Sequence, residues 1–369
     1  MGISNNIAKL LIQEAKQKRN PITVNMELLP VCNLDCKMCY IRTNMETVKK
    51  HGGLICADEW LRVAKEMVDA GTLFLLLTGG EVFLYPEFRY LYENLKKMGF
   101  IITINTNATM IDENIVMWLK ENPPECVSIS LYGASNETYK DICGRDGMFD
   151  LVDTAITSLQ RAGITVECKT LMNNLNVRDM KACHEYCASR NIPWEMTTYA
   201  FPPARKEEKG NQVRFDEEEA VLHRLAYNEM FFSKEAVCQS AQEYIQKYNN
   251  GKEIIGQQRY GLTCSASNSS CWINWKGQMT PCAMMNDPYE LPFEIGFLKS
   301  WEQLKIASDK LMLCGECSVC DKRSVCNACP ASCYAETGHI DGKPDYHCKM
   351  TELYLKHMFL TMVKNLSVR

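Results

Sequence analysis

The sequence predicts an α/β protein, a partial (β/α)6 TIM-like barrel followed by a small cysteine-rich domain. From about residue 22 to 200, short apolar runs alternate with amphipathic segments of helix length. This alternation is typical of right-handed βαβ units around a parallel sheet. It stops after Phe201-Pro202-Pro203, and half of the 20 cysteines lie between residues 264 and 348. A complete eight-stranded barrel would need more chain than the alternating segment provides.

The strands and helices of the barrel follow from local signals in chain order. Six apolar runs are the predicted strands, namely Thr23–Leu29, Leu73–Leu77, Ile101–Asn105, Val127–Leu131, Thr165–Leu171 and Trp194–Thr198. Capping residues, glycines and prolines mark the limits of five predicted helices. Four of them run from Asp58 to Gly71, from Pro86 to Gly99, from Asp112 to just before Pro123, and from Val177 to Arg190; the remaining helix, fourth in chain order, ends at Gly163. Acidic or proline residues at a helix start and glycine at its end are the expected boundary signals.

These elements divide the chain into five predicted parts. They are an N-terminal helical extension (1–21), the partial barrel (22–204), a helical linker (205–260), the cysteine-rich domain (261–350) and a C-terminal helix (351–369). Residues 253–348 contain no long periodic element, so we expect that region to fold around metal. The closing helix is expected over about Thr351 to Asn365.

Composition excludes several classes of protein. With 41 basic and 45 acidic side chains the net charge is −4, so we expect no nucleic-acid or membrane partner. The N-terminus lacks the apolar core of a signal peptide, and a cytoplasmic location is expected. In a reducing compartment, 20 cysteines are more plausible as metal ligands than as disulfides. Seven scattered cysteines are interpreted as small core residues, namely Cys56, Cys126, Cys143, Cys168, Cys183, Cys187 and Cys238.

Cys32, Cys36 and Cys39 form a CxxxCxxC motif directly after the first predicted strand. Three thiolates on one short loop can bind three corners of a 4Fe–4S cluster and leave the fourth iron open to a ligand. The alternative is a structural zinc site, which needs a fourth ligand and is usually built from paired CxxC motifs. The position at a βα loop, the catalytic face of such barrels, favours the cluster.

This motif resembles the signature of the radical S-adenosylmethionine (radical SAM) superfamily, CxxxCxΦC in a partial barrel. Tyr40 follows the last cysteine, while Met38 replaces the usual aromatic residue. After the second predicted strand, Gly79, Gly80 and Glu81 match the family's GGE motif. Glycines let the backbone approach a ligand closely, and a carboxylate accepts hydrogen bonds from an ammonium group. The resemblance implies that these three residues hold the methionine amino group of S-adenosylmethionine, next to Tyr40.

Further candidates lie where later strands end. Asn107 follows the third predicted strand and Ser130 the fourth, and Arg145 lies in a glycine-flanked loop. By the resemblance, Asn107, Ser130 and Arg145 contact the cofactor, with ordinary loop hydrogen bonding as the alternative. Three charged residues are candidates for substrate binding at the barrel mouth: Glu167, Lys169 and Arg205. The alternative is that they form a buried ion pair and a surface charge.

The ten C-terminal cysteines allow two 4Fe–4S clusters or several zinc sites by spacing alone. Their pattern resembles the SPASM domain of peptide-modifying radical SAM enzymes. The resemblance implies one auxiliary cluster on Cys264, Cys271, Cys282 and Cys329, and a second on Cys317, Cys320, Cys326 and Cys348. Some relatives leave the iron at the position of Cys271 open, which is the alternative for the first cluster. Pro330 occupies the usual position of the fourth ligand of the first cluster. Cys329 is favoured there over Cys333, and Cys314 and Cys333 remain as spare thiols.

The resemblance implies three 4Fe–4S clusters and reductive cleavage of S-adenosylmethionine to a 5′-deoxyadenosyl radical that abstracts hydrogen from a peptide. The expected product is a thioether or carbon–carbon crosslink, or an oxidised residue, in a ribosomally made peptide. Alternatives are a peptide epimerase, a small-molecule dehydrogenase, or a zinc-ribbon binding module without radical chemistry. Ala283 after Cys282 argues against formylglycine formation, because sulfatase maturases carry an aspartate there. Expected partners are a separate leader-recognition protein and a flavodoxin- or ferredoxin-type electron donor.

Overall fold

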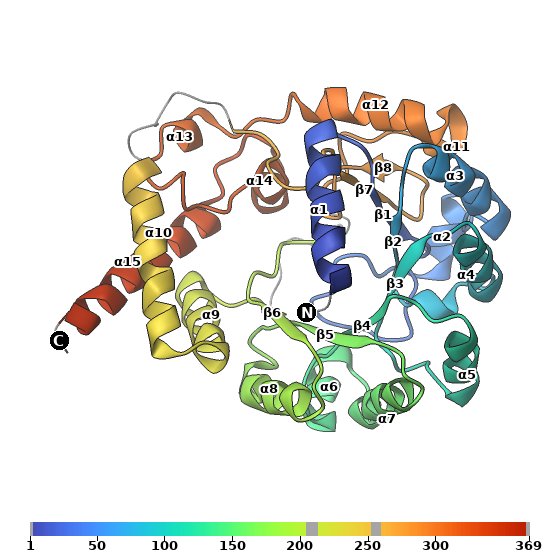
Figure 1. Ribbon diagram of the computed structural model, residues 1–369, viewed down its shortest axis with the longest axis horizontal. Coiled ribbons are helices and arrows are strands. Elements are labelled where there is room, and N and C mark those ends of the chain that lie inside the picture. The colour runs from blue at the N-terminus through green and yellow to red at the C-terminus, as the bar shows by residue number, and fades with distance from the viewer. Residues whose placement is uncertain (1–2, 204–212, 252–259, 367–369) are drawn as a thin grey trace.

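The computed structural model describes residues 3–203, 213–251 and 260–366. Its centre is one curved sheet in the order β6-β5-β4-β3-β2-β1-β7-β8 (Figure 1). The first seven strands are parallel to their neighbours, and only β8 is antiparallel, to β7. The strands span Thr23–Glu27 (β1), Phe74–Thr78 (β2), Ile101–Thr106 (β3), Cys126–Ser130 (β4), Val166–Leu171 (β5), Trp194–Thr197 (β6), Ser270–Ile273 (β7) and Met279–Thr280 (β8).

The predicted fold class is confirmed, and each of the six predicted strands is present within two residues of its expected limits. The sheet nevertheless has two strands more than predicted. Residues of β7 pair with β1, Thr23 opposite Ser270 and Met26 opposite Ile273, on the edge away from β2. The cysteine-rich segment therefore extends the barrel sheet itself, because β7 and β8 are too short to show a period in the sequence.

Helices cover the outer side of the sheet, and a second group lies beyond β6 (Figure 1). The barrel helices are α2 (Met45–Lys50), α3 (Ala57–Asp69), α4 (Phe88–Lys97), α5 (Glu113–Glu121), α6 (Asn136–Cys143), α7 (Met148–Arg161) and α8 (Met180–Ser189), with single turns η1 (Val82–Leu84) and η2 (Val177–Asp179). The remaining helices are α1 (Ile3–Lys18), α9 (Glu217–Phe231), α10 (Lys234–Gly251), α11 (Pro292–Ile295), α12 (Phe297–Ser308), α13 (Gly315–Ser318), α14 (Pro330–Thr337) and α15 (Asp345–Leu366). The described part of the chain has no helix long and apolar enough to cross a membrane.

Four helices differ from expectation. The 12-residue α12 lies in the stretch predicted to lack a long element, and it packs against α3 on the outside of the barrel. Only Gly296 marks its start, because no side chain caps it. The short helices α2 and α6 lie inside loops that follow strands, where Asn44 and Ser135 cap them. The helix α15 starts at Asp345, six residues before its predicted start.

The two faces of the sheet differ in chemistry. Side chains alternate between faces along a strand, and Val24 and Met26 of β1 are fully buried against the outer helices, with Trp60 and Met67 of α3. The opposite face of the same strands carries polar groups, including Glu27, whose carboxylate accepts a 2.9 Å hydrogen bond from the Trp272 indole of β7. The apolar face stabilises the barrel, and the polar face is left for chemistry.

Of the seven scattered cysteines, four are buried as expected: Cys143, Cys168, Cys183 and Cys187. Cys126 and Cys238 are partly buried, whereas Cys56 is exposed just before α3. The interpretation of Cys56 as a core residue is therefore wrong, because it occupies the N-cap position of α3, at the helix surface.

A nearly buried ion pair joins the end of the barrel to the cysteine-rich region. Arg214 donates from Nη1 to both carboxylate oxygens of Glu336, at 2.9 and 3.2 Å, and the Tyr199 hydroxyl donates to Glu336 Oε1 at 2.8 Å. The Glu336 side chain is 7 % exposed and that of Arg214 is 23 % exposed. Tyr199 follows β6, Arg214 precedes α9 and Glu336 belongs to α14, so one carboxylate connects three segments.

Replacing Glu336 with Gln should lower the free energy of unfolding by about 2 kcal/mol, because it leaves the Arg214 charge without its counter-ion. The loss should appear as a lower urea midpoint of the anaerobically purified protein. Glu46→Gln is the matched control, since the Lys50–Glu46 pair is 71 % and 74 % exposed and such pairs contribute little. Equal midpoints for the two variants would contradict a stabilising role of the Glu336 ion pair.

Candidate active site

The first part of the site is the loop that follows β1, and it carries Cys32, Cys36 and Cys39. Cys36 is 8 % exposed and the other two are partly buried. Burial raises the pKa of Cys32 to about 11 and that of Cys36 well above its usual value, and the neighbouring thiols add to both shifts. The structure thus brings the three predicted cysteines together. Because a metal binds thiolates, cluster binding here must release protons.

Hydrogen-bond donors already point at these sulfurs. The Leu34 N–H donates to Cys32 Sγ at 3.4 Å, and the Arg42 N–H donates to Cys39 Sγ at 3.3 Å. Hydrogen bonds to cysteine sulfur are part of what sets the potential of an iron–sulfur cluster. The donor set therefore fits thiolates that bind iron.

The end of β2 forms the floor under this loop. The N–H groups of Gly80 and Glu81 donate to the carbonyls of Leu29 and Val31, at 2.8 and 3.0 Å. A Cβ on Gly79 would lie 2.5 Å from Leu29 O, and one on Gly80 would overlap the Val31 carbonyl. Glycine is thus required at both positions so that the cysteine loop can lie directly on the backbone of the strand end.

The Glu81 carboxylate is fully buried and bonded within the chain. It accepts from the Thr106 hydroxyl at 2.8 Å, the Asn107 N–H at 2.9 Å and the Phe83 N–H at 3.2 Å. Burial raises the pKa of Glu81, and these donors oppose the shift. Its side chain joins the ends of β2 and β3. It does not present a free carboxylate to a cofactor amino group.

Asn107 connects the end of β3 to the cysteine loop. Its amide nitrogen Nδ2 lies 3.5 Å from Cys32 Sγ and 2.9 Å from Asn33 Oδ1. Its own Oδ1 accepts from the Thr109 N–H at 2.9 Å. Asn107 is 5 % exposed, so the structure places it against a predicted iron ligand.

The other predicted cofactor residues are more open. Tyr40 is partly buried and packs on Phe201, with ring centroids 5.1 Å apart. Ser130 is partly buried at the end of β4, opposite Lys169 of β5. Arg145 is exposed in the loop between α6 and α7, two residues beyond the buried Cys143, which lies close enough to Cys36 to affect its pKa.

The charged pair predicted at the barrel mouth is present on β5. Lys169 Nζ lies 3.0 Å from Glu167 Oε1, and the two side chains are 50 % and 32 % exposed. The pair is therefore reachable from solvent and is not the buried ion pair considered as its alternative. Arg205 lies outside the described residues.

Sequence reasoning assigned no role to Tyr132, two residues after β4. Its phenol lies close enough to Cys32, Cys36 and Cys39 for all three to influence its pKa. Burial raises the pKa of the Tyr132 phenol well above its ordinary value. The available signal was position alone, since a tyrosine at the carboxyl end of a barrel strand faces the catalytic side of such folds.

In the cysteine-rich region, four of the predicted ligands line one cavity. Cys317, Cys320, Cys326 and Cys348 surround it, together with Lys322, Arg323 and Lys343. These four are the cysteines that the resemblance assigns to the second auxiliary cluster. The basic side chains around them suit a site that holds the negative charge of four thiolates.

The cysteines assigned to the first auxiliary cluster are less closely grouped. Cys282 and Cys329 pack in one apolar cluster around Met285 and Leu311, which also includes Leu262, two residues before the exposed Cys264. Cys333 packs instead with Cys317 and Cys314. This packing favours Cys329 over Cys333 as the companion of Cys282.

Cys271 does not join that group. It lies on β7 opposite Val24 of β1, is fully buried and belongs to the main barrel core. Burial alone raises its pKa. The alternation of side chains along β7 directs Cys271 to the helix-covered face of the sheet, which spacing in the sequence could not reveal, so the structure gives no support to Cys271 as a ligand.

Comparisons with known proteins agree with this geometry. Residues 26–187 match the family model of the Radical SAM superfamily. The AdoMet-dependent heme synthase of Methanosarcina barkeri is 24 % identical over 337 residues, covering 88 % of this chain and 95 % of that protein. The antilisterial bacteriocin subtilosin biosynthesis protein AlbA of Bacillus subtilis is 24 % identical over 274 residues, covering 73 % of this chain and 57 % of that protein.

A solved structure shares the architecture over most of the chain. Streptococcus suis SuiB bound to precursor peptide SuiA superposes with a TM-score of 0.64 at 16 % identity, covering 93 % of this chain and 80 % of that chain. At this identity the likeness concerns the fold. The aligned part extends well beyond the 162-residue family match, so it includes much of the cysteine-rich region.

Fold and site define an enzyme built on a partial α/β barrel, with a three-thiol loop at the carboxyl edge of its sheet. Residues 26–187 of the chain form a radical SAM domain, and the protein is an enzyme. Its cofactors are S-adenosylmethionine and a 4Fe–4S cluster. The resemblance drawn from the cysteine loop and Gly79–Glu81 is confirmed for this domain.

Proposed function

We propose that this enzyme abstracts a hydrogen atom from a peptide and leaves a crosslink or an oxidised residue in a ribosomally made product. One observation carries the proposal. A second set of four cysteines surrounds a single cavity beside the barrel, as a site for an auxiliary cluster requires. The names of relatives agree, since AlbA serves subtilosin biosynthesis and SuiB binds a precursor peptide.

When bound, the catalytic cluster supplies one electron that cleaves S-adenosylmethionine to methionine and a 5′-deoxyadenosyl radical. In our proposal Cys32, Cys36 and Cys39 are its ligands, and the backbone of Gly79 to Glu81 faces the methionine amino group. Asn107 keeps Cys32 in place through its 3.5 Å contact with the sulfur. Tyr40, Ser130 and Arg145 border the space left for the rest of the cofactor.

Proposed ligands of the auxiliary clusters are Cys317, Cys320, Cys326 and Cys348 for one, and Cys264, Cys282 and Cys329 for the other. With Cys271 in the barrel core, the second group supplies three thiols, and one iron is left for substrate or another ligand. We further propose a flavodoxin- or ferredoxin-type donor for the first electron, a separate leader-recognition protein and a cytoplasmic location.

The cavity gives a direct test of the group that comprises Cys317, Cys320, Cys326 and Cys348. Cys320→Ala should remove about four iron atoms per chain, since a cube that loses a ligand is expected to be lost from its site. Formation of 5′-deoxyadenosine should continue, whereas modified peptide should not accumulate. Cys238→Ala is the matched control, because Cys238 is a partly buried cysteine on α10 without an assigned cluster. An unchanged iron content in the Cys320 variant would contradict the assignment.

A second candidate is radical oxidation of an iron porphyrin or a related small molecule. The similarity to the heme synthase of Methanosarcina barkeri favours this candidate, because this chain covers 95 % of that protein's length. The two candidates are separated by mass spectrometry of parallel reactions with S-adenosylmethionine and dithionite. One reaction contains the short peptide encoded nearest to this chain's gene, and the other contains iron coproporphyrin. The peptide should lose two hydrogen atoms, while a mass change of the porphyrin alone would favour the second candidate.

A further inference from the structure

The backbone of the cysteine loop is hydrogen-bonded to α6, a helix of a different barrel unit. The Lys37 N–H donates to the Ile142 carbonyl near the end of α6, at 3.0 Å. Lys37 follows Cys36 directly and precedes Cys39 by two residues, so this bond lies in the middle of the CxxxCxxC motif. The place of α6 therefore influences where the middle of the cysteine loop lies.

Packing in the barrel core does not by itself hold α6 in one place. Tyr139 and Ile142 are fully buried in the main core, but apolar contacts have no preferred direction. The helix has only eight residues and lies between β4 and α7. Directional contacts are needed to keep so short a helix from sliding or turning on the core.

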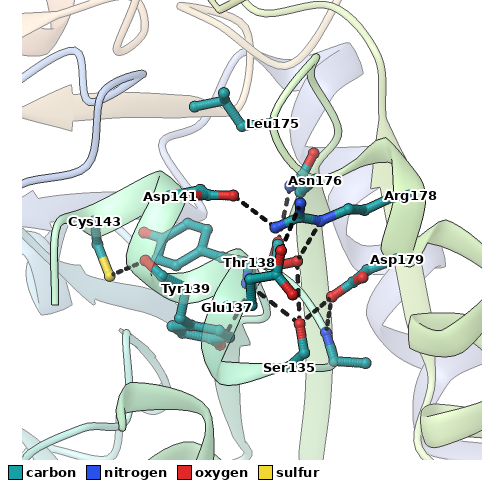
Figure 2. A network of polar contacts seen from close by, with 12 residues as sticks. Ser135, Glu137, Thr138, Tyr139, Asp141, Cys143, Leu175, Asn176, Arg178 and Asp179 are labelled. Atoms are coloured by element: carbon teal, nitrogen blue, oxygen red, sulfur yellow. Dashed lines mark hydrogen bonds and ion pairs between the residues drawn. The ribbon is translucent and has the colours of Figure 1, made fainter. Parts of the chain in front are cut away.

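The η2 turn, in the loop after β5, supplies such contacts through Arg178, as Figure 2 shows. Arg178 donates from Nε to the Thr138 hydroxyl at 3.1 Å and from Nη2 to Asp141 at 2.6 Å. Its Nη1 also lies 3.2 Å from Glu137 Oε1. One guanidinium thus contacts α6 over a full helical turn.

The next residue, Asp179, binds the start of the same helix. Its Oδ2 accepts from the Ala134 N–H at 2.8 Å and from the hydroxyl of Ser135, the N-cap residue of α6, at 3.1 Å. Asp179 occupies the N-cap position of α8 but makes no capping hydrogen bond there. A carboxylate near a helix N-terminus stabilises that helix. The charge of Asp179 is therefore directed at α6 instead of at its own helix.

The loop that carries these two residues is itself held firmly. Asn173 and Asn176 are both fully buried in it. The Asn173 N–H donates to Asn176 Oδ1 at 2.7 Å, and Asn176 Nδ2 donates to Tyr132 O at 2.9 Å and to Leu171 O at 3.1 Å. Tyr132 follows β4 and Leu171 ends β5, so the η2 turn has a firm base on the sheet.

We propose that Arg178 and Asp179 are positioning residues, which set the place of the catalytic cysteine loop through α6. The contacts run from the η2 turn to the start and middle of α6, and from the Ile142 carbonyl near its end to Lys37. The place of the loop sets the distance between the cluster and the bound cofactor, and small displacements at a reacting centre lower a rate strongly. This inference rests on the proposed assignment of Cys32, Cys36 and Cys39 as ligands.

The test combines hydrogen exchange with kinetics in the cluster-loaded enzyme. Asp179→Ala removes the acceptor of the Ala134 N–H and loosens α6. Exchange of the Lys37 amide, followed by mass spectrometry of short peptides that contain it, should become on the order of tenfold faster. The rate of 5′-deoxyadenosine formation per bound iron, at saturating S-adenosylmethionine, should fall on the order of tenfold.

Asp153→Ala is the matched control. Asp153 accepts from the Tyr186 hydroxyl at 2.7 Å and from Arg190 Nη2 at 2.9 Å, so it joins α7 to α8 with a similar set of hydrogen bonds. Its loss should leave both Lys37 exchange and the rate at the wild-type values. Asp179→Asn keeps an acceptor oxygen, and both of its values should fall between those of the wild type and Asp179→Ala.

Gly133→Ala reaches the same contact without removing a polar group. Its Cβ would lie 2.8 Å from Asp179 Oδ2 and 2.5 Å from Thr138 Cγ2, so it should push α6 away from the η2 turn and give faster Lys37 exchange and a slower rate. Equal values in Asp179→Ala and Asp153→Ala, or faster exchange with an unchanged rate, would overturn the inference. Cleavage of S-adenosylmethionine by the triple alanine variant of Cys32, Cys36 and Cys39 would instead refute the ligand assignment.

Discussion

Replacing Cys32, Cys36 and Cys39 together with alanine should abolish the formation of 5′-deoxyadenosine. The three thiols are the only cysteines on the loop after β1, and backbone N–H groups already donate to two of their sulfurs at 3.3 and 3.4 Å. Without them the cluster cannot be held where Gly79 and Gly80 bring the strand end close to the loop. The expected product level is that of a reaction without enzyme, measured by liquid chromatography after incubation with S-adenosylmethionine and dithionite.

Iron analysis distinguishes this result from a general failure to fold. The wild type should contain about twelve iron atoms per chain and the triple variant about eight, because each 4Fe–4S cluster carries four. Secondary structure by circular dichroism should be unchanged, since the cysteine loop lies outside every strand and helix. Cleavage of S-adenosylmethionine by a variant that lacks all three thiols would refute their assigned role.

Gly80→Ala should have nearly as large an effect, although glycine has no side chain to take part in the reaction. Its Cβ would overlap the Val31 carbonyl, and Val31 precedes Cys32 directly. The Glu81 N–H also donates to that carbonyl, at 3.0 Å. The clash therefore moves the cysteine loop away from β2. A displacement of about 1 Å at a reacting centre can lower a rate by about 100-fold, and we expect a loss of that size in 5′-deoxyadenosine formation.

Gly315→Ala provides the matched control. Gly315 begins α13, and a Cβ there would meet no atom within 4 Å. That variant should keep the wild-type rate of S-adenosylmethionine cleavage. If Gly80→Ala also kept it, the close approach of β2 to the cysteine loop would have no part in building the site.

The barrel could be predicted because each unit repeats a local pattern. An apolar run, a turn and an amphipathic helix with clear boundary residues recur from β1 to α8, and such signals depend on neighbours in the sequence. The strands β7 and β8 could not be predicted in this way. They have four and two residues, and β7 exists because it pairs with β1, which lies about 245 residues earlier in the chain.

The site was predictable where chemistry depends on residue type and spacing, as at the cysteine loop and at Gly79 and Gly80. The site was less predictable where function depends on the direction in which a side chain points. Glu81 is directed inward to Thr106 and Asn107, and Cys271 faces the barrel core. These directions are set by strand register and by loops that meet only in the folded chain, so no local pattern encodes them.

Transfer of deuterium from substrate to cofactor tests the central claim most directly. The short peptide encoded nearest to this chain's gene is prepared with deuterium on its side chains and α carbons. It is then incubated with the reduced, cluster-loaded enzyme and S-adenosylmethionine. The account predicts 5′-deoxyadenosine that carries one deuterium, together with peptide that has lost two hydrogen atoms. Unlabelled 5′-deoxyadenosine with unchanged peptide, alongside turnover of an iron porphyrin in the parallel reaction, would contradict it.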